Sequence, residues 1–127
     1  MKKLLVVDDQ EHVLRLVKAI VSRDNRFEAI LARDGRQAIE IAQKEHPDAI
    51  FVDILMPGMD GYEVCREIKT NPITAGTIVI MFSAFANDYD TQKSSEVKAD
   101  GYFAKPFNPS LFIHKVEEAL GLPTGKS

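Results

Sequence analysis

The stretch AIFVDILMPGMDG, residues 49–61, joins a short apolar run to a loop that contains proline and glycine. The run Ala49–Val52 has the length and the β-branched and aromatic content of a buried strand, and Asp53 closes it. In open twisted sheets, functional groups gather at the carboxyl ends of the strands. The stretch therefore predicts that the Asp53 carboxylate lies at that edge of a sheet.

Similar apolar runs, rich in valine and isoleucine and bounded by turn residues, recur along the chain and indicate mostly buried strands. The expected strands are Lys3–Val7, Glu28–Ala32, Ala49–Val52, Ile78–Phe82 and Gly101–Ala104. Helical segments lie between them, the clearest being Glu11–Arg23, whose apolar residues follow a one-faced helical spacing. Because strands and helices alternate, the sequence predicts a doubly wound α/β fold, in which five helices cover both faces of a five-stranded parallel sheet.

Capping residues mark where several of these helices begin. Two acids have a partner three residues later, the spacing of a capping box, and they predict helix starts near Gly35 and Gly61. These pairs are Asp34 with Gln37 and Asp60 with Glu63. In the last helix, Asn108 suits the N-cap, Pro109 the first helical position and Gly121 the end.

The fourth helix is expected over Asn87–Lys98, a mostly polar segment. Its few apolar anchors are Tyr89, Val97 and Ala99. A helix with so little apolar surface should be the most weakly held, which makes it a candidate switch element.

The composition favours one domain. The 127 residues, 45% of them hydrophobic, can build one core but are too few for two ordinary domains. We expect a domain over residues 1–121 and a short tail over 122–127.

A net charge of −3 argues against the basic face that direct nucleic-acid binding needs. The lone Cys65 lacks an internal disulfide partner, and no signal peptide or membrane-inserting segment is visible, so we expect a cytoplasmic protein.

Two further acids, Asp8 and Asp9, end the apolar run Leu4–Val7. If this run lies next to the strand that ends at Asp53, three carboxylates share one pocket, where their like charges raise a pKa or recruit a cation. Mg²⁺ favours carboxylates, waters and a phosphate as ligands, which suits this cluster better than a zinc site. The alternative is that Asp8 or Asp9 caps the helix over Glu11–Arg23, and one acid can do so while the other binds the metal.

A carboxylate beside a cation can attack phosphorus and form an aspartyl phosphate. We assign this role to Asp53, with an ordinary strand-end acid as the alternative. Lys105 and Ser83 follow two further apolar runs, and they can neutralise and hydrogen-bond the phosphoryl oxygens. Taken singly, each is also typical of a solvated charge or a turn residue. Tyr102 is expected to point from its strand toward a helix-covered face.

Together these residues make the chain similar to the response-regulator receiver domains of two-component signalling, in particular to the single-domain chemotaxis regulators. The resemblance covers nearly the whole chain and implies a flavodoxin-like receiver fold. Four segments carry it: Asp8-Asp9, DILMPGMDG at 53–61, Ser83-Ala84 and GYFAKPF at 101–107.

The resemblance implies a phosphorylation-dependent switch that promotes its own phosphorylation and dephosphorylation and is not an enzyme with a separate substrate. Asp53 would accept the phosphoryl group from the phosphohistidine of a sensor histidine kinase or phosphotransfer protein, and Lys105 would contact that group. The implied Mg²⁺ ligands are the side chains of Asp8, Asp9 and Asp53 and the backbone carbonyl of Leu55.

The resemblance also implies a conformational response. Ser83 would move toward the phosphate while Tyr102 swings inward, which alters the face built from the fourth helix, fifth strand and fifth helix. A downstream protein target would read this change. In the family, the peptide bond before the proline matching Pro106 is usually cis.

The chain departs from the commonest pattern at Ser83, where threonine is more usual, although the hydroxyl is kept. Leu55 and Phe85, two residues beyond Asp53 and Ser83, are both apolar. We expect them to hinder water and to lengthen the phosphorylated state.

Competing classes fit less well. A haloacid dehalogenase phosphatase needs an acid two residues after its nucleophile, where this chain has Leu55. The tail GLPTGKS, residues 121–127, is one residue too short for a phosphate loop. The remaining alternative is a receiver-like protein-binding module that works without phosphorylation, and its partner binding would survive Asp53→Asn.

Overall fold

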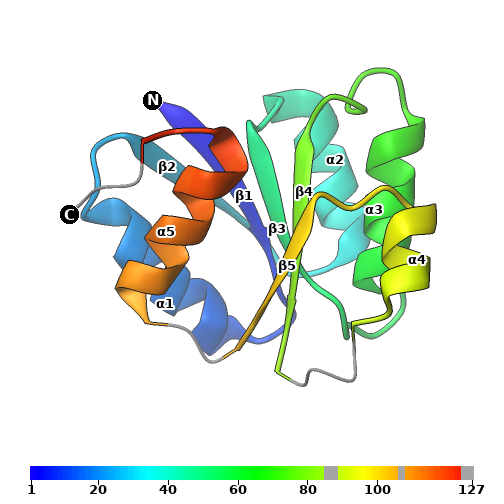
Figure 1. The fold of residues 1–127 in the computed structure, drawn as a ribbon, viewed down its shortest axis with the longest axis horizontal. Coiled ribbons are helices and arrows are strands. Elements are labelled where there is room, and N and C mark those ends of the chain that lie inside the picture. The colour runs from blue at the N-terminus through cyan, green and yellow to red at the C-terminus, as the bar shows by residue number, and fades with distance from the viewer. Residues whose placement is uncertain (85–88, 106–107, 124–127) are drawn as a thin grey trace.

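Five parallel strands form one sheet in the order β2-β1-β3-β4-β5 (Figure 1). The computed structural model describes residues 1–84, 89–105 and 108–123. The strands are β1 (Lys2–Val7), β2 (Phe27–Ala32), β3 (Ala49–Asp53), β4 (Ile78–Ser83) and β5 (Gly101–Ala104). β3 and β4 end one residue later than predicted, because Asp53 pairs with Phe82 and Ser83 with Ala104, and β1 and β2 begin one residue earlier than predicted.

Helices connect the successive strands and cover both faces of the sheet. They are α1 (Glu11–Ser22), α2 (Gly35–Glu45), α3 (Gly61–Thr70), α4 (Thr91–Glu96) and α5 (Pro109–Leu120). α1 and α5 lie on one face, and α2, α3 and α4 lie on the other (Figure 1). The predicted doubly wound α/β fold, with a five-stranded parallel sheet and five helices, is confirmed.

The core consists of two apolar clusters, one on each face of the sheet. In β1, Leu5 and Val7 face the cluster under α2 and α3, whereas Leu4 and Val6 face the cluster under α1 and α5. All four side chains are fully buried. Burial on both faces explains why this strand is a continuous apolar run, and it leaves the strand's carboxyl end as the place for polar groups.

The predicted helix starts are confirmed. At α3, Asp60 accepts a hydrogen bond from the Glu63 N–H, and the Glu63 carboxylate accepts one from the Asp60 N–H. At α2, Asp34 accepts a hydrogen bond from the Gln37 N–H. Asn108 caps α5 in the same way, with proline in the first turn. The capping box fixes the start of α3 directly after the loop that follows β3.

The fourth helix is shorter than predicted. The sequence predicts a helix over Asn87–Lys98, whereas α4 spans Thr91–Glu96 with Asp90 as its N-cap. Residues 87 and 88 lie outside the described residues. Lys98 adopts a left-handed backbone conformation with φ 62°, which is incompatible with a continuing helix. The only buried residue of α4 is Ser94, in agreement with a weakly held helix.

None of the helices in the described ranges has the length and apolar character needed to cross a membrane. Residues 124–127 of the expected tail lie outside the described residues. The division between domain and tail at residue 121 stays a prediction.

Candidate functional site

The ends of β1 and β3 bring the predicted acids together. The two strands pair in register with Val7 opposite Val52, so Asp8 and Asp53 follow side by side. Asp8 is fully buried and Asp53 is 5% exposed, while Asp9 is exposed. One carboxylate oxygen from each of the three acids lies within 4.8 Å of the others. A single cation with oxygen ligands fits this arrangement.

Asp8 also contacts the start of α1. Its Oδ1 accepts a hydrogen bond from the N–H of Gln10, the N-cap residue of α1, at 2.9 Å. Its Oδ2 accepts a hydrogen bond from Lys105 Nζ at 2.8 Å. From the sequence, an acid of the Asp8-Asp9 pair could cap this helix or face the cluster. Neither acid is the N-cap, because Gln10 holds that position; Asp8 faces the cluster through Oδ2 and bonds the Gln10 N–H through Oδ1.

Lys105 supplies positive charge to the two buried acids. Its Nζ lies 2.8 Å from the Asp8 carboxylate and 3.4 Å from that of Asp53. The Lys105 backbone N–H donates a hydrogen bond to the Ser83 carbonyl at 2.7 Å, and Nζ lies 5.1 Å from the Phe82 ring centre. With only 12% of its side chain exposed, Lys105 belongs to the cluster and is not a solvated strand-end charge.

The surroundings of Asp53 disfavour its charged form. Burial, and then the neighbouring Asp8 carboxylate, raise the pKa of Asp53 from an ordinary value of 3.8 to about 6. The Lys105 ammonium and a hydrogen bond from the Leu55 backbone N–H lower this pKa but do not cancel the increase. At neutral pH Asp53 is therefore ionised in a pocket that favours the binding of an additional cation.

The two predicted switch residues lie on the neighbouring strands. Ser83 ends β4 and is 1% exposed, at the same edge of the sheet as Asp53. Tyr102 packs on the face covered by α2, α3 and α4, as predicted, and its ring stacks on Tyr89 with 4.3 Å between centres. Phe85, and the proline at position 106 for which a cis bond is expected, lie outside the described residues.

Gly61 allows α3 to pack closely on the strand that carries Asp53, a role that was not predicted from the sequence. A Cβ at this position would lie 2.7 Å from the Asp53 carbonyl oxygen and 2.9 Å from Ile54 Cα, both of which are backbone atoms. The Gly61 N–H also donates a hydrogen bond to the Ile54 carbonyl at 2.9 Å. The first turn of α3 thus packs directly on the backbone that carries Asp53. The glycine that follows the capping acid Asp60 was the available sequence indication of this close approach.

A comparison of the sequence with known protein families gives a match. The family model for the response regulator receiver domain matches residues 4–117. The chain belongs to this family. Receiver domains are the signalling modules of two-component response regulators.

Individual relatives agree with this assignment. The receiver domain is 35% identical over 119 residues to PhoP, the alkaline phosphatase synthesis transcriptional regulatory protein of Bacillus subtilis. That match covers 94% of this chain and 48% of PhoP, so the chain spans about half the length of this relative. The Vibrio cholerae chemotaxis protein CheY4 has a TM-score of 0.87 at 31% identity, covering 94% of this chain and 99% of that one.

A third relative bears on the metal. The receiver domain of the Pseudomonas aeruginosa sensor histidine kinase PA1611 has a TM-score of 0.83 at 27% identity, and the match covers 94% of this chain and 98% of that one. Its structure is described with a magnesium ion coordinated in the active site cleft.

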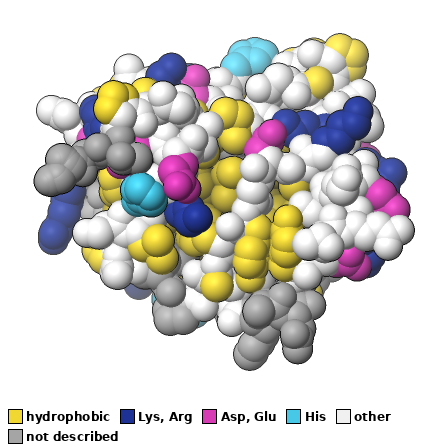
Figure 2. Space-filling model, viewed as in Figure 1, with side chains coloured by type: hydrophobic (Ala, Val, Ile, Leu, Met, Phe, Trp, Pro, Cys, Tyr) yellow, Lys and Arg dark blue, Asp and Glu magenta, His cyan; other side chains and the backbone are white. Residues whose placement is uncertain are grey.

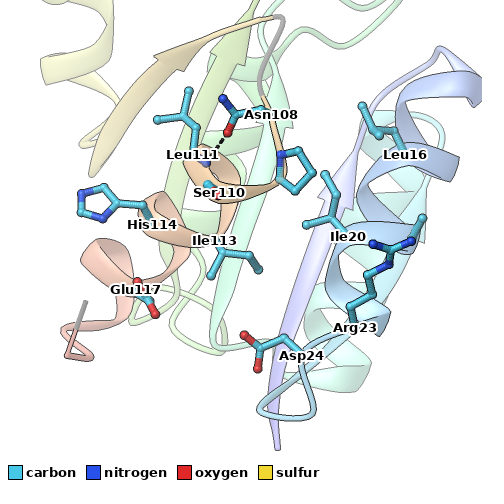
Figure 3. A pocket seen from close by; sticks show the side chains of 12 residues that line it. Leu16, Ile20, Arg23, Asp24, Asn108, Ser110, Leu111, Ile113, His114 and Glu117 are labelled. Atoms are coloured by element: carbon cyan, nitrogen blue, oxygen red, sulfur yellow. Dashed lines mark hydrogen bonds between the residues drawn. The ribbon is translucent and has the colours of Figure 1, made fainter. Parts of the chain in front are cut away.

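The receiver domain also carries a groove away from the acidic cluster. It has a volume of about 900 Å³ and lies between α1 and α5 (Figure 3). Leu16 and Ile20 of α1 line one side, and Leu111 and Ile113 of α5 line the other. The sequence pattern does not indicate this groove, because the groove depends on how two distant helices pack.

The raised pKa of Asp53 predicts a pH-dependent stability of the metal-free protein. Folded Asp53 holds its proton up to about pH 6, whereas the unfolded chain releases it near 3.8, so the contribution of Asp53 to stability is lost as the pH rises from about 4 through 6. The Asp53→Asn variant avoids this loss of stability, because an amide does not ionise. At about pH 8 in EDTA, its free energy of unfolding should exceed that of the wild type by about 1–2 kcal/mol, less than the full shift because the structure relaxes around the buried charge. Urea unfolding between about pH 4 and pH 8 measures this, and a difference that does not grow with pH would contradict it.

Gly61→Ala is expected to lower the free energy of unfolding by about 1–3 kcal/mol, because the added methyl group meets fixed backbone atoms. It should also weaken Mg²⁺ binding by displacing Asp53. Gly76→Ala is the matched control, since a Cβ there meets nothing within 4 Å. Urea unfolding and Mg²⁺ titration test both variants. The prediction fails if the two alanine variants behave alike.

Proposed function

We propose that this receiver domain is a phosphorylation-dependent switch in which Asp53 accepts the phosphoryl group. The observation that carries the proposal is the buried Asp53 carboxylate at the end of β3, beside two further acids and 3.4 Å from the Lys105 ammonium. The proposed donor is the phosphohistidine of a sensor histidine kinase or phosphotransfer protein. A carboxylate oxygen of Asp53 forms a bond to phosphorus as the bond between phosphorus and the histidine nitrogen breaks.

The proposed Mg²⁺ ligands are the side chains of Asp8, Asp9 and Asp53 and the backbone carbonyl of Leu55. Three carboxylate oxygens within 4.8 Å of one another suit a hard cation, and burial together with the Asp8 carboxylate raises the pKa of Asp53, so a bound cation would stabilise its charged form. When bound, the ion supplies charge neutralisation for the phosphoryl oxygens. The likeness to the PA1611 receiver domain supports this assignment.

Lys105 is proposed to neutralise a phosphoryl oxygen, and Ser83 to donate a hydrogen bond to another. In the phosphorylated domain, Ser83 moves toward the phosphate and Tyr102 moves inward. This movement changes the face formed by α4, β5 and α5, where a downstream protein binds. On the side of the molecule that includes β5, hydrophobic side chains gather between α4 and α5, which supports a protein contact there (Figure 2).

Intact-mass spectrometry after incubation with acetyl phosphate tests the proposal. The protein should gain one phosphoryl group in the presence of Mg²⁺ and almost none in EDTA, because the acidic cluster repels the incoming anion when no cation is bound. Equal modification in EDTA would contradict the role of the metal. A protein that stays unmodified under every condition would favour the phosphorylation-independent binding module.

A further inference from the structure

The side chain of Tyr62 in α3 is hydrogen-bonded to the N-terminus of α4. The Tyr62 hydroxyl accepts a hydrogen bond from the Asp90 N–H at 2.6 Å. Asp90 is the N-cap of α4, and its carboxylate accepts a hydrogen bond from the Lys93 N–H in the first turn. The Lys93 ammonium lies 5.6 Å from the centre of the Tyr62 ring. Tyr62 is only 8% exposed, so water competes poorly for this hydrogen bond.

The other end of this connection lies at Asp53. Tyr62 directly follows Gly61, which packs so closely on the Asp53 carbonyl that a Cβ would approach it to 2.7 Å. The Gly61 N–H is also bonded to the Ile54 carbonyl. A displacement of the backbone that carries Asp53 therefore displaces the start of α3, and Tyr62 with it.

Within the described part of the chain, two further hydrogen bonds connect α4 and the residue that follows it to neighbouring side chains. The Tyr89 hydroxyl donates a hydrogen bond to the hydroxyl of Ser94 at 3.1 Å. The Cys65 thiol donates one to the Val97 carbonyl at 3.3 Å. Because this polar helix buries little apolar surface, a single buried hydrogen bond contributes a large share of the free energy that holds the helix against the rest of the domain. Tyr89 also stacks on Tyr102, so a movement at the start of α4 is transmitted to β5.

We propose that Tyr62 is a latch that holds α4 against α3 in the unmodified domain and transmits the state of Asp53 to α4 and to the stacked pair Tyr89–Tyr102. The transmission rests on the proposed phosphorylation of Asp53, whereas the latch itself does not. Tyr62 is a positioning residue, because it acts through Asp90 and the start of α3.

Hydrogen exchange of the unmodified protein tests the latch. Tyr62→Phe keeps the ring and removes the acceptor of the Asp90 N–H. The peptide that covers α4 should exchange about fivefold to tenfold faster than in the wild type, while the free energy of global unfolding stays nearly the same. Tyr89→Phe is the matched control, because it removes a hydroxyl near α4 but leaves the bond to α3, and it should change the exchange of α4 less. Equal exchange of α4 in Tyr62→Phe and the wild type would overturn the latch.

A second set of samples, with excess acetyl phosphate and Mg²⁺, tests the transmission. Exchange of α4 should increase in the modified wild type and should change little in modified Tyr62→Phe, where the helix is already released. Intact mass of the same samples shows whether each protein carries the phosphoryl group. If neither does, the proposed function fails, and the unmodified samples still decide the latch. If both do, an equal increase in the two proteins, or no increase in the wild type, would overturn transmission through Tyr62.

Discussion

An Asp53→Asn variant is expected to stay unmodified after incubation with acetyl phosphate and Mg²⁺, under conditions in which the wild-type protein gains one phosphoryl group. The amide has the shape of the carboxylate but lacks the negative oxygen that attacks phosphorus. It also removes one of the three carboxylates proposed to hold the metal. The fold should be retained, because the change relieves repulsion from Asp8. Intact-mass spectrometry gives the result directly.

The control is Glu40→Gln, which makes the same change from acid to amide at an exposed position on α2. It should be modified as readily as the wild type. If Asp53→Asn were modified as well, the nucleophile would be a different residue. Once a protein partner is known, the same variant separates the two functional hypotheses, because a phosphorylation-independent binding module would bind that partner unchanged.

A Lys105→Met variant is expected to accept the phosphoryl group about 100-fold to 1,000-fold more slowly than the wild type. Methionine resembles lysine in shape but carries no charge, so the negative charge of the phosphoryl oxygens is no longer offset at this point of the cluster. Removal of one such stabilising group commonly lowers rates by about this factor. The rate of adduct formation at fixed acetyl phosphate and Mg²⁺ concentrations is the quantity to measure.

Lys44→Met removes an exposed lysine from α2 and is the matched control. Its rate should equal that of the wild type. Because the Lys105 ammonium lies 2.8 Å from the fully buried Asp8 carboxylate, Lys105→Met should also destabilise the metal-free protein, and Mg²⁺ should restore part of the loss. A wild-type rate for Lys105→Met would exclude Lys105 from the phosphoryl site.

Much of the fold could be predicted from the sequence because the three central strands, β1, β3 and β4, have both faces buried. Such strands are continuous apolar runs, and the residues that end them stand out. Asp8, Asp53, Ser83 and Lys105 each follow or close a run, and the parallel sheet then brings them to one edge. The capping acids were equally readable, because their contacts are local in sequence.

The rest depended on contacts between distant parts of the chain. The two carboxylate oxygens of Asp8 bond Gln10 and Lys105. These contacts depend on the register of β1 and β3 and on the path of the chain after β5. The hydrogen bond between Tyr62 and Asp90 follows from how α3 packs on α4. The start of α4 was misplaced because a polar helix has no apolar periodicity to mark its ends.

The most direct test of the central claim is to locate the phosphoryl group. Borohydride reduces an acyl phosphate to an alcohol, so a phosphorylated aspartate becomes homoserine, which peptide mass mapping identifies. After treatment with acetyl phosphate and Mg²⁺, we predict homoserine at position 53 and unchanged aspartates at positions 8 and 9. Homoserine at another position, or its absence from a protein that has gained the phosphoryl mass, would contradict the assignment of Asp53 as the phosphoryl acceptor.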